Sequence, residues 1–228
     1  MKNSTLLLFL LGLLSITSKA QPQPAFEQGA SGTMNTIRFL NMETNAYKVL
    51  EGSPYIPSER FYEGSVLPAG TNTKWSDGYK LRLNTYSNQL EVNESGVAKT
   101  ISPNYIKGFK IGEAAYFSGY PAVDKLSKNS YFQLLYNGKV KLLKNTTTLM
   151  REVRSHDDVK QGDKFDTYFY YYILENEIMT KVFPNKKSLL KTIPSAKLAA
   201  VEGFINNKAF AFKAEGDFVE TIRFYDSL

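Results

Sequence analysis

Cysteine is absent from the 228-residue sequence, and histidine and tryptophan each occur once. Without cysteine, the chain cannot form disulfides, bind structural zinc through thiolates or use a thiol nucleophile. A single histidine also argues against a transition-metal site, because imidazole is a main ligand of such metals. We therefore expect no metal, no cofactor and a fold stabilised by an ordinary apolar core, for which 14% aromatic residues is ample material.

Long apolar runs are equally scarce, since only residues 6–14, "LLLFLLGLL", form one. This run is too short to span a bilayer. It follows the positive Lys2 and precedes small residues at Ser18 and Ala20, which is the pattern of a secretory signal peptide cleaved after Ala20. We expect an exported, soluble protein, periplasmic or extracellular, with no transmembrane segment after signal cleavage.

Concentrated charge is missing as well. The formal net charge is +6, but acidic and basic residues are interspersed along the chain, and the longest run of adjacent basic residues is the pair Lys186–Lys187. Nucleic-acid binding usually needs a basic face. The sequence therefore predicts no nucleic-acid partner.

Turn residues and apolar periodicity indicate an α+β fold: a β-rich part resembling a small barrel-like antiparallel sheet, then β-hairpins and C-terminal amphipathic helices. The predicted segments are a signal peptide in 1–20, a flexible leader in 21–35, a β-rich barrel-like region in 36–122, antiparallel β-hairpins in 123–183 and a C-terminal helical cap packed on the hairpins in 184–228.

The barrel-like region rests on short alternating runs between turn signals. In "YKLRLNT", Tyr79, Leu81 and Leu83 share one face of a predicted strand. Five such strands with a tight turn before the last suit a small SH3-like barrel.

The strongest hairpin signal is Asn137-Gly138 between two alternating runs, because Asn-Gly favours a two-residue type I′ turn. Such a turn pairs Tyr136 with Lys139 and Leu135 with Val140. The polar stretch 151–164 that follows is predicted to be an exposed loop.

Residues 165–183, "FDTYFYYYILENEIMTKVF", read as a strand, a turn near Glu175–Asn176 and a returning strand in which Thr180 lies opposite Tyr171. Both faces of the first strand are apolar, which is typical of a central strand covered on both sides. One face, the tyrosine face, carries Tyr168, Tyr170 and Tyr172. We predict that the C-terminal helices cover it.

Those helices have recognisable starts. Asn185 is expected to cap the first, Ser195 the second, and the third begins near Glu215–Asp217. If the helices pack elsewhere, the tyrosines become an open binding surface, since tyrosine rings with wet hydroxyls serve such surfaces.

Catalytic patterns are weak throughout. His156 stands beside two aspartates in a polar stretch, Ser188 and Lys191 match S-x-x-K without its partner motifs, and no G-x-S-x-G elbow occurs. The acids in "DDVKQGDKFD" do not follow the EF-hand spacing. The sequence therefore identifies no catalytic residue.

Several longer pieces together resemble a group of uncharacterised, signal-peptide-bearing exported proteins of Bacteroidetes bacteria. The matching pieces are "YKVLEGSPYI", "LRLNTYSNQLEV", "LLYNGKVKLLK", "FPNKKSLLKTIPS" and "DFVETIRFYDSL", spread over residues 47–228. The resemblance implies a compartment and an architecture. No activity is assigned to that group, so no residue role is carried over.

The sequence thus favours an exported, non-catalytic protein with a binding or envelope-structural role and an envelope protein or a glycan as partner. The alternative is a carbohydrate-binding or carbohydrate-processing protein that uses exposed aromatic residues, with an enzyme of unknown type third. The residues proposed for binding are Trp75, Tyr168, Tyr170 and Tyr172.

Overall fold

A computed structural model describes residues 39–41, 49–70 and 74–228, with side chains from Glu51 onward. The predicted signal peptide and leader lie outside the described residues, and so does the start of the predicted β-rich region, residues 36–38. The described residues belong to one compact unit of the chain, residues 33–228.

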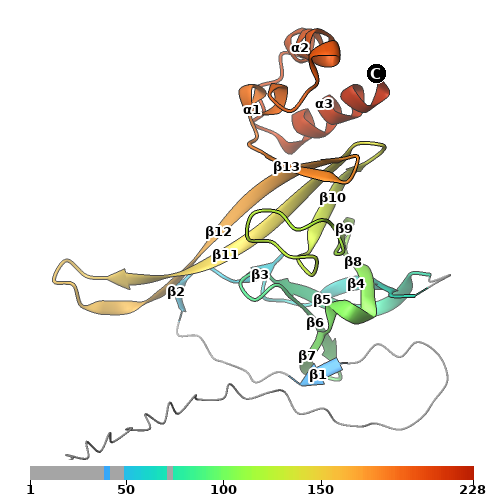
Figure 1. Ribbon diagram of the computed structural model, residues 1–228. Helices are drawn as coiled ribbons and strands as arrows, with labels where there is room; N and C mark the ends of the chain where they lie inside the picture. Colours follow the sequence, from blue (N-terminus) through green and yellow to red (C-terminus); the bar gives the residue numbers. More distant parts are fainter. Residues whose placement is uncertain (1–38, 42–48, 71–73) are drawn as a thin grey trace, which may run out of the picture. The chain divides into compact units, whose positions relative to one another are not determined.

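The described part is mostly β, an open antiparallel sheet followed by three helices (Figure 1). Eleven strands lie in the order β1-β7-β6-β5-β4-β8-β9-β10-β11-β12-β13, while β2 pairs with β12 and β3 with β5. The strands are β1 Phe39–Asn41, β2 Val49–Glu51, β3 Tyr55–Ile56, β4 Tyr62–Pro68, β5 Ser76–Asn84, β6 Gln89–Glu94, β7 Val97–Ile101, β8 Ile106–Ile111, β9 Ala114–Phe117, β10 Phe132–Asn137, β11 Lys141–Arg154, β12 Lys160–Glu175 and β13 Ile178–Val182.

The predicted small barrel is wrong, because the sheet is not closed. Closure would require the last strand of the N-terminal region to return to its first strands. Instead β9 pairs with β10, with Phe132 opposite Phe117, so the sheet continues into the later hairpins. The alternation in β5 does predict the core correctly, since Leu81 and Leu83 are buried there.

The Asn137-Gly138 prediction is wrong in register. Tyr136 pairs with Leu142 and Asn137 with Lys141, which leaves a three-residue loop. Gly138 does not adopt the positive φ that a type I′ turn requires. The reason is tertiary: the Asp226 carboxylate enters this loop and accepts hydrogen bonds from the Val140 N–H and the Tyr136 hydroxyl.

A two-residue turn instead joins β12 to β13 at Asn176-Glu177, where φ is +50° and +61°. It places Glu175 opposite Ile178 and Tyr171 opposite Val182. The predicted pairing is therefore shifted by two residues, which keeps every side chain on its predicted face.

Three helices end the chain, α1 Lys186–Leu190, α2 Ser195–Lys208 and α3 Glu215–Ser227. Asn185 caps α1 as predicted, because its Oδ1 accepts from the Ser188 N–H at 2.8 Å. Ser195 does not cap α2; it is the first helical residue, and Pro194 occupies the cap position.

The helices pack on the face of β12 opposite to the predicted one. Tyr171 and Ile173 join Val182 and helix residues such as Val201 and Ile222 in one buried cluster. The prediction that the helices cover the tyrosine face is therefore wrong. Alternation along the strand puts Tyr172 and Tyr171 on opposite sides, and the helices bury the latter.

Another segment covers the tyrosine face. Tyr172 and Leu174 pack with Phe132 and Leu143, and the connection between β9 and β10 contributes partly buried apolar side chains, including Val123. This end of β12 is covered on both faces, as its composition indicates. A third cluster, centred on residues such as Leu81 and Phe109, fills the N-terminal strands. No helix in the described part of the chain is long and apolar enough to cross a membrane.

Candidate functional site

The candidate site is the part of the β11–β12 hairpin that extends beyond β10 and β13, namely residues 145–154 of β11 and 160–170 of β12, called here the ribbon. β11 has 14 residues and β12 has 16, whereas the neighbouring β10 and β13 have 6 and 5. The shorter strands therefore accompany only one end of the hairpin, and the ribbon continues without them (Figure 1). The polar stretch predicted as a loop is thus mostly strand, paired from Arg151–Lys164 to Arg154–Lys160.

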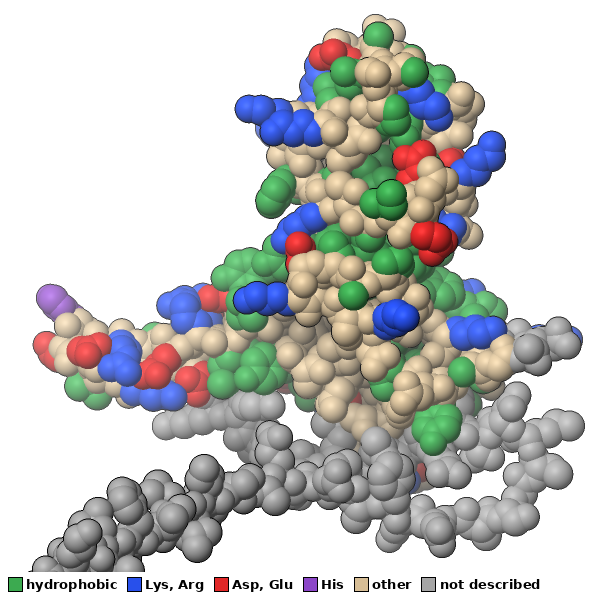
Figure 2. Space-filling model, in the orientation of Figure 1, with side chains coloured by type: hydrophobic (Ala, Val, Ile, Leu, Met, Phe, Trp, Pro, Cys, Tyr) green, Lys and Arg blue, Asp and Glu red, His purple; other side chains and the backbone are tan. Residues whose placement is uncertain are grey.

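Four large apolar side chains of the ribbon are exposed. Their exposed fractions are 51% for Leu149, 40% for Met150, 43% for Tyr168 and 54% for Phe169. We call these four residues the ribbon patch. Figure 2 shows hydrophobic side chains along this part of the molecule, between the charged tip of the hairpin and the rest of the described chain. The pairing puts Leu149 and Tyr168 on one face and Met150 and Phe169 on the other.

A chain of threonines fixes the ribbon against the N-terminal strands. The Thr148 hydroxyl lies 2.6 Å from that of Thr85, in the β5–β6 turn, and 3.0 Å from that of Thr167. The Thr148 N–H also donates to the Thr85 carbonyl. Beside this contact, Tyr86 packs on Phe165 with ring centroids 5.5 Å apart. The ribbon patch is therefore presented on an anchored strand pair.

The charges next to Phe169 are already paired. The Lys144 ammonium lies 4.7 Å from the centre of the Phe169 ring and 2.7 Å from a Glu215 carboxylate oxygen. The Tyr171 hydroxyl donates to the same carboxylate at 2.9 Å. Burial first, and this hydrogen bond second, raise the pKa of Tyr171, so it stays neutral at physiological pH. The arrangement is an ion pair that joins β11 to the first residue of α3.

The tyrosine face has a similar arrangement. The Lys181 ammonium lies 4.1 Å from the centre of the Tyr170 ring and 3.3 Å from Asp124. The Tyr172 hydroxyl donates to the same aspartate at 3.2 Å. These contacts fix the inner end of the tyrosine face.

The structure separates the four residues proposed from sequence. Tyr168 is exposed, Tyr170 is half-buried and Tyr172 is only 1% exposed, so the three rings do not form one open platform. Trp75 is half-buried, packs edge-on to Phe117 at 6.1 Å and lies under the Lys110 ammonium. Trp75 precedes β5, and the tyrosines belong to β12.

Sequence reasoning missed Phe169, Leu149 and Met150. Phe169 lies on the face of β12 opposite the tyrosine face, for which no binding role is predicted, and the other two follow a threonine run that carries no binding motif. The sequence gives no clear signal for them, because the polar stretch 151–164 is predicted as a loop and so conceals how long the two strands are.

The residues weighed for catalysis have other surroundings. His156 is exposed in the turn between β11 and β12 (purple in Figure 2). The Ser188 hydroxyl accepts a hydrogen bond from the Phe183 N–H, and so holds the start of α1. Within the ranges that the structure describes, no three His, Cys, Asp or Glu side chains are grouped to hold a metal ion.

A hollow next to Tyr171 has a volume of about 120 Å³. It is lined by Tyr171, Pro184, Phe212, Lys213, Ala214, Glu215 and Phe218. Sites for drug-sized molecules measure roughly 300 Å³ or more. The hollow is therefore too small for such a ligand.

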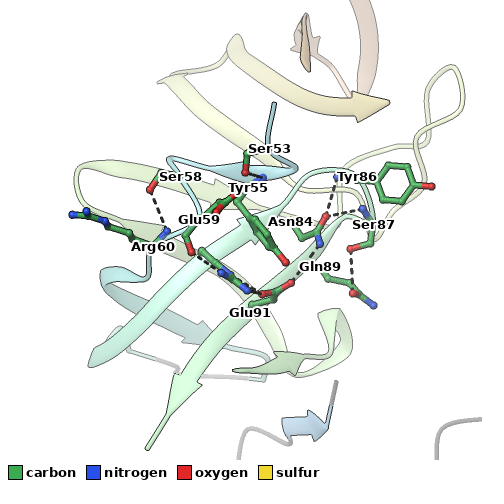
Figure 3. Close-up of polar contacts among 11 residues, drawn as sticks. Ser53, Tyr55, Ser58, Glu59, Arg60, Asn84, Tyr86, Ser87, Gln89 and Glu91 are labelled. Atoms are coloured by element: carbon green, nitrogen blue, oxygen red, sulfur yellow. Dashed lines mark hydrogen bonds and ion pairs between the residues drawn. The ribbon is translucent and has the colours of Figure 1, made fainter. Parts of the chain in front are cut away.

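A cluster of polar contacts belongs to the N-terminal strands (Figure 3). Arg82 donates from Nε to Glu91 at 2.7 Å and from Nη1 to the Glu59 carbonyl at 2.5 Å. Its guanidinium lies over the rings of Tyr55 and Phe61, at 3.8 and 4.3 Å from their centres. Glu91 is fully buried. Arg82 and Glu91 neutralise each other across 2.7 Å, so we infer that this pair stabilises the N-terminal strands.

Comparison with known proteins adds no relative: no family model, no curated protein and no solved structure matches the chain.

Proposed function

We propose that the chain is an exported, non-catalytic binding protein that holds a protein of the cell envelope through the ribbon patch. The observation that carries this proposal is the exposure of Leu149, Met150, Tyr168 and Phe169 on one anchored strand pair. Clustered apolar side chains on a surface mark interaction sites more often than isolated ones do. Aromatic residues are also enriched where protein partners bind most strongly.

Two further features support the proposal. The signal-peptide pattern of residues 1–20 favours a partner in the envelope or outside the cell. The ionisable groups around the patch, Lys144 and Glu215 on one face and Lys181 and Asp124 on the other, are paired with one another. Such pairs position the strand and supply no unpaired acid or base.

A glycan partner is the second candidate, because the Tyr168 and Phe169 rings are exposed. Consecutive residues of a strand point to opposite faces. These two rings therefore cannot stack on one sugar face together, and Tyr172 is buried. This geometry favours a protein partner that contacts both sides of the ribbon.

The test uses the chain from Gln21 to Leu228, which keeps every described element. Envelope proteins captured on it by cross-linking are identified and purified, and their dissociation constants are measured against Tyr168→Lys/Phe169→Lys. We expect the double variant to weaken binding roughly thirtyfold, as loss of about 2 kcal/mol implies.

The matched control is Val97→Lys, because Val97 is 55% exposed but lies at the β6–β7 turn. It should bind as the wild type does. Equal affinity of the double variant and the wild type would refute the proposal, and selective binding on a glycan array that is lost in the double variant would favour the carbohydrate alternative.

A further inference from the structure

We infer that an extended, uncharged peptide segment of the partner adds to the open edge of β12, opposite residues 166–170, as an extra β-strand. This inference rests on the proposed function and specifies how the partner is held. Strand addition draws affinity from main-chain hydrogen bonds and specificity from the side chains beside them.

The edge is open because two short strands share it and leave a gap. β11 accompanies β12 along one side over its whole length. On the other side β13 extends only as far as Tyr171, and β2 pairs only with Asp163 and Lys164. Gly52, directly after β2, lies against the Phe165 carbonyl. In the described ranges, no strand accompanies 166–170 on that side.

The backbone groups that face this edge follow from two independent contacts. Gly52 lies at the gap side of β12, so the Phe165 carbonyl points there. At the other end, the two-residue turn makes Glu175 and Ile178 a hydrogen-bonded pair, so the groups of Glu175 point to the β13 side. Because orientation alternates and the ladder is regular between them, the N–H and C=O of Thr167 and Phe169 point into the gap.

These four groups have no hydrogen-bond partner in the described part of the chain. They are therefore solvated donors and acceptors on a strand whose backbone is already fixed by β11. A row of this kind is a template for pairing with another chain.

The size of the gap decides between a short segment and a second copy. Five residues, Asp166 to Tyr170, are open. The β12 strand of a second copy has 16 residues and would run into β13 and β2 on either side of the gap. A short extended segment whose two ends turn away fits the space.

The chemistry of the segment follows from its neighbours. Thr167 and Phe169 would flank it on one face of the sheet, and Tyr168 and Tyr170 on the other. The nearest charges already have opposite partners: Lys144 with Glu215, Lys181 with Asp124, Arg151 with Asp166 and Lys164 with Glu51. The site therefore suits uncharged β-branched or aromatic residues, which pack well beside such side chains.

Amide hydrogen exchange tests the edge directly. The probe is the synthetic peptide acetyl-Thr-Val-Tyr-Val-Thr-amide, added to the chain from Gln21 to Leu228. In the free chain, the amides of Thr167 and Phe169 should exchange fast and those of Tyr168 and Tyr170 slowly. The peptide should slow exchange at Thr167 and Phe169 by about fivefold or more and leave the other two unchanged. A peptide N-methylated at its Val amides is the control and should have no effect.

A variant then separates this inference from the proposed function. Thr167→Pro removes the N–H that faces the gap and places a ring there, while the ladder to β11 loses no donor. Thr167→Val is its matched control, because it loses the same hydroxyl but keeps the N–H. With the purified partner, Thr167→Pro should weaken binding about tenfold relative to Thr167→Val.

Unchanged binding by a folded Thr167→Pro, together with weakened binding by Tyr168→Lys/Phe169→Lys, would overturn strand addition and leave the proposed function standing. Unchanged binding by both would overturn both. If Thr167→Pro does not fold, the exchange experiment on the unmodified chain decides, and equal effects of the plain and N-methylated peptides would refute the inference.

Discussion

Asp226, in the last helical turn of the chain, accepts a hydrogen bond from the Val140 N–H at 2.7 Å, although the two residues are 86 positions apart. The same carboxylate accepts from the Tyr136 hydroxyl at 2.9 Å. Gly138 lies so close that a Cβ added there would collide with the Asp226 carboxylate. The C-terminal helix thus determines the conformation of the β10–β11 loop.

Replacing Asp226 by Ala should destabilise the protein by about 2 kcal/mol, because buried Val140 would keep an unpaired N–H and two hydrogen bonds to a charged acceptor would be lost. Chemical denaturation measures the change. Tyr136→Phe is the control and should lose only about 1 kcal/mol. Equal stability of Asp226→Ala and the wild type would show that the loop does not depend on this contact.

The contribution of Asp226 should also depend on pH. Burial opposes its ionisation, but hydrogen bonds from Val140 and Tyr136 outweigh it, and its pKa lies below the ordinary value of 3.8. For a carboxyl group with a lowered pKa, the stabilisation is present above the ordinary value and is lost as pH falls through the folded-state value. The stability gap between wild type and Asp226→Ala should therefore be constant near neutral pH and shrink below pH 3.8. A gap that grows on acidification would contradict this assignment.

Alkaline pH should destabilise the protein through tyrosines that folding buries fully, such as Tyr116, or partly, such as Tyr120. Burial raises the pKa of Tyr116 and of Tyr120 from 10.0 to about 12, with Glu215 adding to the effect at Tyr116. Since the unfolded chain ionises at the ordinary value, this stabilisation is present below pH 10 and is lost as pH rises toward 12. Denaturant titrations should show stability falling above pH 10, less steeply in Tyr116→Phe. Full phenolate absorbance near pH 10 in a folded chain would contradict the prediction.

The sequence predicts those features that local rules decide. Alternation places Leu81 and Leu83 in the core, and Asn185 is identified as a cap because its side chain serves the turn that immediately follows. Distant contacts lie beyond these rules. Asp226 determines the conformation of the loop at Gly138, and nothing within the "YNGK" stretch indicates this contact.

The side of β12 that the helices cover was equally beyond local reasoning. Tyr171 and Tyr172 are the same residue type on opposite faces, and both are buried. Their hydroxyls differ in partner, since Tyr171 meets Glu215 of α3 and Tyr172 meets Asp124 of the β9–β10 connection. The candidate site was therefore only partly predictable: Tyr168 was selected from sequence, whereas Phe169 was not.

A glycine in the β12–β13 turn should stabilise the protein. Glu177 adopts a left-handed conformation with φ of +61°, which is unfavourable for a residue with a Cβ. Glu177→Gly should raise the free energy of unfolding by about 0.5–1 kcal/mol. Lys139→Gly, in a turn position without positive φ, is the control and should not stabilise. A loss of stability in Glu177→Gly would show that its side chain, not its backbone, dominates there.

Removing one partner of the buried ion pair between Arg82 and Glu91 should lower the free energy of unfolding strongly. Replacing both partners by apolar residues should lower it much less. Glu91→Ala would leave the guanidinium between the Tyr55 and Phe61 rings without its counter-charge, and should cost about 3 kcal/mol. The apolar double variant Arg82→Met/Glu91→Leu should recover most of this loss, because neither desolvated charge remains.

The matched control is Glu94→Ala, since Glu94 pairs with Lys99 at a similar distance of 2.6 Å but with a side chain 48% exposed to solvent. An exposed pair contributes less than about 1 kcal/mol. Equilibrium denaturation of the three variants separates the two environments. If Glu91→Ala costs no more than Glu94→Ala, the Arg82 cluster does not stabilise the N-terminal strands through its buried ion pair, and the stacking on Tyr55 and Phe61 must hold Arg82 in place.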